Sequence, residues 1–138
     1  MEFIGRYIWQ ISKNGQTYLD KALKKYRIGS AQHRILRILY HTGGFSQEEI
    51  SNALGIDKAA TAKAVKRLLR EGYIERKTDE KDKRIYRVNL TEKAMLVKDD
   101  LLKILTNWQK ILLKDFTAEE ASMISVLIEK MAENSNKF

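Results

Sequence analysis

The chain contains no cysteine and no proline, and its two histidines are His33 and His41. The lack of cysteine excludes a disulfide framework, a thiolate zinc site and a thiol redox switch. Two histidines eight residues apart do not complete a metal site by themselves, so we expect neither a metal nor a cofactor. The sequence also lacks a glycine-rich phosphate loop and a cluster of carboxylates, which argues against an enzyme.

Long hydrophobic runs are missing as well. No apolar stretch approaches the roughly 20 residues that are needed to span a bilayer. The N-terminal residues Met-Glu-Phe-Ile-Gly-Arg have an acidic second position and early polar breaks, unlike a signal peptide. We therefore expect a cytoplasmic protein with no membrane partner.

Positive charge is unevenly distributed along the 138 residues. Lysine and arginine outnumber aspartate and glutamate by 26 to 18, a net charge of +8. Such a surplus fits a polyanionic partner, although an ordinary basic protein would also show it. Residues 57–87 hold eleven basic and six acidic side chains, so this short stretch carries +5 of the total. It is the candidate surface for a polyanion.

Residues 46–72 have the pattern of two short helices joined by a tight turn. Ser46 and Glu49 predict a capping box at the first helix start, and Gly55 supplies the left-handed residue that ends this helix. Asp57 predicts the N-cap of a second helix, which Gly72 ends. This order predicts a helix-turn-helix.

The period changes after the second helix. Residues 73–77 and 85–90 alternate as strands, and the charged run 78–84 joins them as a hairpin. Phe45 is placed to form a short first strand that pairs with this hairpin. A helix-turn-helix followed by a basic hairpin is a winged helix, so we expect a mainly α fold with a small α+β winged module.

Amphipathic helices flank this module. Residues 3–26 predict one long helix, and Ser30 predicts the N-cap of a compact helix that ends at Gly43. Thr91 predicts the N-cap of a helix of about six turns, and Thr117 with Glu120 predicts a capping box before the last helix.

We expect residues 30–91 to form the winged DNA-binding region and residues 1–29 and 92–138 to form a helical dimerisation region, all within one intertwined domain. The alternative is a monomer in which the flanking helices pack on one another.

The outer face of the second helix has the chemistry of a DNA major-groove reader. Stepping the helix by 100° per residue places Thr61, Val65 and Leu68 together on the core side. The opposite face and the helix start hold small and basic side chains, which can approach bases and phosphates closely. The candidate DNA-binding residues there are Lys58, Ala59, Ala60, Lys63, Lys66, Arg67 and Arg70. The alternative is a solvated helix face, which explains less well why the face carries four cations and no anion.

The hairpin tip is the second candidate contact. Its DNA-binding candidates are Lys81, Asp82, Lys83 and Arg84. A guanidinium at this position suits the narrow minor groove of A·T-rich DNA, and the Asp82 carboxylate can fix the rotamer of Arg84. A solvated turn of alternating charges is the ordinary alternative.

The run SQEEISNALGIDKAATAKAVKRLLREGYIERKTDEKDKRIYRVNLTEK resembles the MarR family of bacterial transcription regulators. The likeness lies in the ordered pieces S-x-x-E-I, L-G-I, G-Y-I-x-R, D-x-x-D-x-R and L-T-x-K. The resemblance implies a homodimer that binds pseudo-palindromic double-stranded DNA, with recognition helices in successive major grooves and Arg84 in the minor groove. Ala59 and Ala60 depart from the family, which commonly has serine or threonine there.

The resemblance also implies release from DNA by a small aromatic or anionic effector bound between the flanking helices and the winged module. The candidate pocket residues are Tyr7, Ile11, Tyr18, His33, Arg37 and Trp108, although each could equally be a core or surface residue. The lack of cysteine excludes the peroxide-sensing thiol chemistry of some relatives. We thus expect a DNA-binding regulator, most simply a repressor. The alternatives are a nonspecific architectural DNA binder and a winged module that binds proteins.

Overall fold

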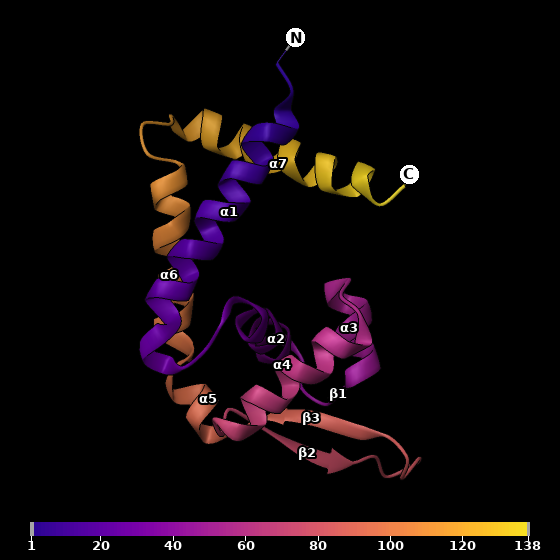
Figure 1. Cartoon of the computed structure of the whole chain (residues 1–138). Coiled ribbons are helices and arrows are strands. Elements are labelled where there is room, and N and C mark those ends of the chain that lie inside the picture. The colour runs from indigo at the N-terminus through magenta and orange to yellow at the C-terminus, as the bar shows by residue number, and fades with distance from the viewer. Residues whose placement is uncertain (1, 138) are drawn as a thin grey trace. The chain divides into compact units, whose positions relative to one another are not determined.

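The computed structural model describes residues 2–137 and divides the chain into two units, residues 1–105 and 106–138. Its elements are α1 (Ile4–Leu23), the 3-10 turn η1 (Lys24–Tyr26), α2 (Ser30–His41), β1 (Phe45–Ser46), α3 (Gln47–Leu54), α4 (Lys58–Arg70), β2 (Ile74–Thr78), β3 (Tyr86–Leu90), α5 (Glu92–Leu96), α6 (Lys98–Leu112) and α7 (Ala118–Ser135). The predicted class, mainly α with a small winged sheet, is confirmed. Within the first unit, α2, α3 and α4 lie together beside the sheet (Figure 1).

The predicted helix-turn-helix is present as α3 and α4. The Ser46 hydroxyl accepts the amide of Glu49 at 3.1 Å, and Asp57 Oδ1 accepts the amide of Ala60 at 2.7 Å. Gly55 ends α3 with a φ of 64°, in the left-handed region that favours glycine. Only one of the two hydrogen bonds of the predicted capping box is present. The Glu49 carboxylate accepts a hydrogen bond from the guanidinium of Arg87 in β3, and not from the amide of Ser46.

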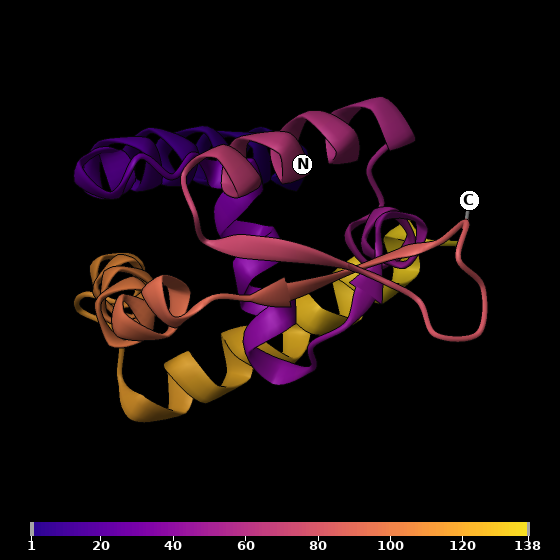
Figure 2. The same ribbon diagram turned by 90° about the horizontal axis from the view of Figure 1, so that it is seen from below.

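The three strands form an antiparallel sheet in the order β1-β3-β2, which confirms both the hairpin and the short first strand. Phe45 pairs with Val88, and Ile74 pairs with Leu90. Both hairpin strands begin one residue later than the alternation predicts. The loop that joins β2 to β3 projects as the hairpin tip (Figure 2). The basic residues of that loop are thereby carried away from the core.

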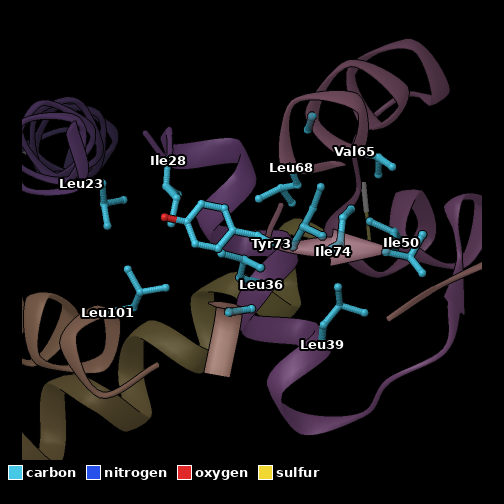
Figure 3. Close-up of a cluster of buried hydrophobic side chains, with 14 residues drawn as sticks. Leu23, Ile28, Leu36, Leu39, Ile50, Val65, Leu68, Tyr73, Ile74 and Leu101 are labelled. Carbon is cyan, nitrogen blue, oxygen red and sulfur yellow. The ribbon is translucent and has the colours of Figure 1, made fainter. Parts of the chain in front are cut away.

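The core of the first unit is formed by side chains from both its helices and its sheet. Tyr73 lies in the middle of a buried apolar cluster with its hydroxyl directed toward Ile28 (Figure 3). That hydroxyl donates to the Tyr26 carbonyl at 2.6 Å, so a buried polar atom is satisfied. Val65 and Leu68 of α4 are buried in the same cluster, as the helical projection predicts. Burying each such side chain contributes about 1.5–3 kcal/mol before the entropy of folding is subtracted.

Three predicted boundaries were wrong. The long first helix does not continue to Tyr26, because α1 ends at Leu23 and Arg27 then takes a left-handed φ of 57°. Ser30 is the first residue of α2, and Gly29 occupies the N-cap position. The helix after Thr91 is not continuous, since Val97 separates α5 from α6.

The second unit contains the end of α6 and all of α7. The capping box before α7 is confirmed by reciprocal bonds between Thr117 and Glu120, at 2.9 and 3.1 Å. No described residue between 106 and 137 is buried. Large apolar side chains are therefore exposed on α7, among them Met123 and Val126. Among the helices described here, none combines the length and the apolar character that a membrane span requires.

Candidate nucleic-acid interface

The core-facing residues of α4 determine which side of this helix points outward. Thr61, Val65 and Leu68 are buried, and the hydroxyl of Thr61 is held from two sides. It accepts the Ser51 hydroxyl at 2.7 Å and donates to the Asp57 carbonyl at 3.0 Å. This buried pair ties α3 to α4 and fixes the rotation of α4 about its axis.

The opposite side of α4 is a cationic surface. The helix contains no acidic residue, and six of its seven candidate DNA-binding side chains are exposed: Lys58, Ala59, Ala60, Lys63, Lys66 and Arg70. Arg70 Nε lies 4.0 Å from the Glu71 carboxylate, the outer limit of an ion pair. The surface therefore keeps its positive charge available for an anion outside the chain.

Arg67, the seventh candidate, is less exposed than the other six. It is half-buried, and its Nη2 donates to the carbonyl of Arg27 at 3.3 Å. The guanidinium thus rests against the connection between α1 and α2, because this connection passes beside α4. Arg67 therefore still contributes positive charge to the outward face of α4, and its guanidinium is held by the bond to the Arg27 carbonyl.

The predicted pair of Asp82 and Arg84 is present at the hairpin tip. Arg84 Nε donates to Asp82 Oδ1 at 3.0 Å and Nη2 to Oδ2 at 3.1 Å, a bidentate arrangement. The bonds from Arg84 hold the pKa of Asp82 below its usual value. The arginine side chain is otherwise 90% exposed, so it is oriented yet accessible. Lys81 and Lys83 are exposed beside it.

Arg87 of β3 connects this tip to the helix-turn-helix. Its Nη1 donates to Glu49 of α3 at 3.0 Å and to the Gly44 carbonyl at 2.8 Å. Its Nε donates to Asp79 at 2.8 Å, which lowers the pKa of this carboxyl. Asp79 also accepts the backbone amides of Lys81 and Asp82, at 3.2 and 2.9 Å. A continuous series of hydrogen bonds therefore runs from α3 through Arg87 to the tip.

Replacing Arg87 by leucine should loosen the tip, because Asp79 then loses the side chain that orients its carboxylate. We expect amide hydrogen exchange of Lys81 and Asp82 to accelerate about tenfold or more, as for a locally opened segment. Lys77→Leu is the matched control, since Lys77 is the strand partner of Arg87 and pairs only with Glu75 in the described residues. Equal exchange rates in the two variants would contradict this role of Arg87.

The six candidate pocket residues differ in their surroundings. Tyr7 and Ile11 are exposed on α1, and Arg37 is exposed on α2. Tyr18 is half-buried and donates to the Ile104 carbonyl at 3.4 Å. Trp108 is half-buried in the α6 segment that belongs to the second unit. Their common role in binding an effector stays a prediction.

His33, the sixth candidate, is buried inside the first unit. It is 1% exposed, and neither ring nitrogen has a hydrogen-bond partner among the described residues. Burial, followed by the charges of Arg37 and Arg34, lowers the pKa of His33 to about 4. The imidazole is therefore neutral at physiological pH.

Sequence reasoning missed Arg87 and noted Asp79 only as the first residue of the D-x-x-D-x-R run. The signal that could have found them is an arginine in a strand position next to a core valine, Val88. A cation there needs partners, and the acidic residues Asp79 and Glu49 were available. Their distance along the chain concealed the connection.

The arrangement defines a winged helix-turn-helix protein with a basic recognition helix. The family model for the MarR family matches residues 28–86. A MarR transcriptional regulator from Methanosarcina mazei Go1 has a solved structure that is 42% identical, covers 99% of both chains and superposes with a TM-score of 0.93. The chain belongs to the MarR family and is a winged-helix transcription regulator, which confirms that it is not an enzyme.

Two further relatives broaden this comparison. The HTH-type transcriptional regulator BilQ of Clostridioides difficile (strain CD3) is 28% identical over 86% of this chain and 80% of its own. A mutant MarR from E. coli, solved in complex with operator DNA, is 24% identical, covers 93% of this chain and 92% of its own, and has a TM-score of 0.83. At this identity the second relative shows the fold alone.

Proposed function

We propose that this regulator is a repressor that binds pseudo-palindromic double-stranded DNA as a homodimer. The observation that carries the proposal is the outward face of α4, which holds cations and no acidic residue while its opposite face is locked into the core. The related MarR mutant that was solved with operator DNA supports the same partner. Because its partner is DNA, we place the protein in the cytoplasm.

In this proposal α4 enters the major groove. Ala59 and Ala60 near its start are small enough for close approach, and their methyl groups can contact thymine methyls. Lys63, one turn further, can reach guanine O6 and N7. Lys66 and Arg70 neutralise phosphates on either side. The hairpin tip then places Arg84, oriented by Asp82, in the adjacent minor groove, where A·T-rich sequence makes the potential most negative.

The dimer accounts for apolar surface that the single chain leaves exposed. Phe3, the N-cap residue of α1, is 81% exposed, and Ile8 of α1 is 49% exposed. The second unit has no buried residue among those described. A second copy would cover these side chains, which are too many for an ordinary monomer surface. Residues 1–29 and 92–138 are then the dimerisation region, and residues 30–91 the DNA-binding region. A two-fold axis would set two α4 helices about one DNA turn apart.

We also propose that a small aromatic or anionic effector modulates DNA binding. His33 supports this part, because its two ring nitrogens are buried without partners among the described residues. Buried polar groups normally have hydrogen bonds, so an unpaired one is a candidate ligand contact.

The second candidate function is a nonspecific architectural DNA binder. It is favoured by Ala59 and Ala60, which carry no hydrogen-bonding group where the family commonly has hydroxyls. Such a protein would bind every duplex through phosphates alone, with a steep dependence on salt.

Fluorescence anisotropy separates the two functions. We expect the protein to bind the intergenic DNA upstream of its own gene at least a thousandfold more tightly than random duplex at about 150 mM salt. Sedimentation equilibrium at micromolar concentration should give twice the chain mass of 16.1 kDa. Equal affinity for both duplexes would contradict specific binding, and a mass of one chain would contradict the dimer.

A further inference from the structure

Two adjoining hollows lie between the end of α1, the start of α2 and the outward face of α4. Their volumes are about 530 and 610 Å³, and both are lined by Asp20, Gly29, Arg67 and Arg70. Lys63 and Lys66 belong to the first hollow, and Lys24, Arg27 and Glu71 to the second. We call the two together the α1–α4 groove. It lies within the first unit of the chain.

The charge of the α1–α4 groove is strongly positive. Six cations line it against two acids, Asp20 and Glu71. Glu71 contacts Arg27 and Arg70 only at 4.0 Å, the outer limit of an ion pair. Exposed pairs of this length contribute little free energy, so these cations are available to another anion.

Arg67 is fixed where the two hollows meet. Its bond to the Arg27 carbonyl holds one side of the guanidinium, and Gly29 makes room for the other. A Cβ on Gly29 would lie 3.2 Å from Arg67 Nη1 and 2.5 Å from Gln32 Oε1, so a side chain there would displace them. The groove therefore presents a preorganised cation between Lys63 and Lys66 on one side and Lys24 and Arg27 on the other.

We infer that the α1–α4 groove holds the sugar–phosphate backbone of the DNA strand beside the major groove that α4 enters. This inference rests on the proposed function and extends the DNA contact beyond the winged module, to Lys24 and Arg27 at the end of α1. The groove is continuous with the outward face of α4, because Lys63 and Lys66 belong to both. A single small anion neutralises one or two charges, whereas six cations spread over two hollows match a regularly charged strand.

The salt dependence of binding tests the inference. Each phosphate contact contributes about 0.9 to the slope of log K against log salt concentration. The double variant Lys24→Gln/Arg27→Gln should therefore lower the slope by about 2 to 4 per dimer, for one or two lost phosphate contacts in each protomer. It should weaken binding of the upstream DNA and of random duplex by the same factor. The ratio of the two affinities should not change, because these residues contact no base. Thermal melting of the variant confirms that it is folded.

Lys13→Gln/Lys21→Gln is the matched control, since it removes two α1 cations that do not line the groove. An unchanged slope in the groove variant, or one equal to that of the control, would overturn the inference. So would saturable binding of inorganic phosphate that depends on Lys24 and Arg27 without any change in the DNA slope, because the groove would then serve a free anion. If the unaltered protein shows no preference for its upstream DNA, the proposed function fails at that earlier step.

Discussion

Replacing Arg84 by alanine should weaken binding to the upstream DNA by about 10- to 100-fold and abolish the preference for A·T-rich sequence at the flanks of the site. The expected loss is large because the side chain is already oriented before DNA arrives. Both guanidinium donors that face Asp82 are bound within 3.1 Å, so little rotamer entropy remains to be lost. Each dimer would lose two such contacts.

Anisotropy titrations with duplexes that differ only in their flanks measure this effect. Lys83→Ala is the comparison variant, because it removes an exposed cation one residue away that is also a candidate DNA contact but is not oriented by Asp82. Its loss of affinity should be smaller than that of Arg84→Ala. Asp82→Asn should give an intermediate loss, since it keeps Arg84 and weakens its orientation. Lys63→Ala should act differently and relax the preference for bases in the major groove. Equal and small losses for Arg84 and Lys63 variants would contradict the proposed docking.

Acidification should destabilise the folded chain through His33. The unfolded histidine titrates near its ordinary pKa of 6.5, whereas burial lowers the folded pKa to about 4. Between these values the unfolded state binds the additional proton, so the free energy of unfolding decreases as the pH falls through this window. Above pH 7 both states are neutral at this residue, and it contributes no pH dependence. The full penalty is on the order of 3 kcal/mol, because one pKa unit corresponds to about 1.4 kcal/mol.

Urea denaturation of the unaltered protein and His33→Leu at several pH values between 7.5 and 4.5 isolates this contribution. The carboxylates that titrate in the same range are present in both proteins, so their effect cancels in the difference. We expect the stability of His33→Leu relative to the unaltered protein to increase steadily as the pH falls below 6.5. A difference that is the same at every pH would show that the buried histidine is not responsible.

The helix-turn-helix and the sheet could be predicted from the sequence because their determinants are local. Ser46 and Asp57 cap helices within three residues of themselves, and Gly55 is needed for its left-handed backbone. The hairpin was predicted from two segments in which apolar and polar residues alternate and from the charged run between them. The error at Ser30 has a local origin too, since Gly29 and Ser30 are adjacent and the amide of Gly29 is satisfied by Gln32.

The missed parts of the interface depend on tertiary contacts. Arg87 meets Asp79 eight residues away and Glu49 thirty-eight residues away, and neither spacing has a recognisable pattern. The α1–α4 groove forms because the connection after α1 passes beside α4, which brings Arg27 to Arg67 across forty residues. Helical projection placed Arg67 on the correct face, but only packing reveals that its guanidinium is held.

The hydroxyl pair of Ser51 and Thr61 has a consequence for how this regulator can change its target. Thr61→Val would preserve the volume of the side chain and strand the Ser51 hydroxyl in the interior, so in related sequences these two positions should vary together. None of the outward residues of α4 takes part in this pair. The recognition surface can therefore be exchanged residue by residue, in evolution or by design, while the orientation of the helix is inherited unchanged.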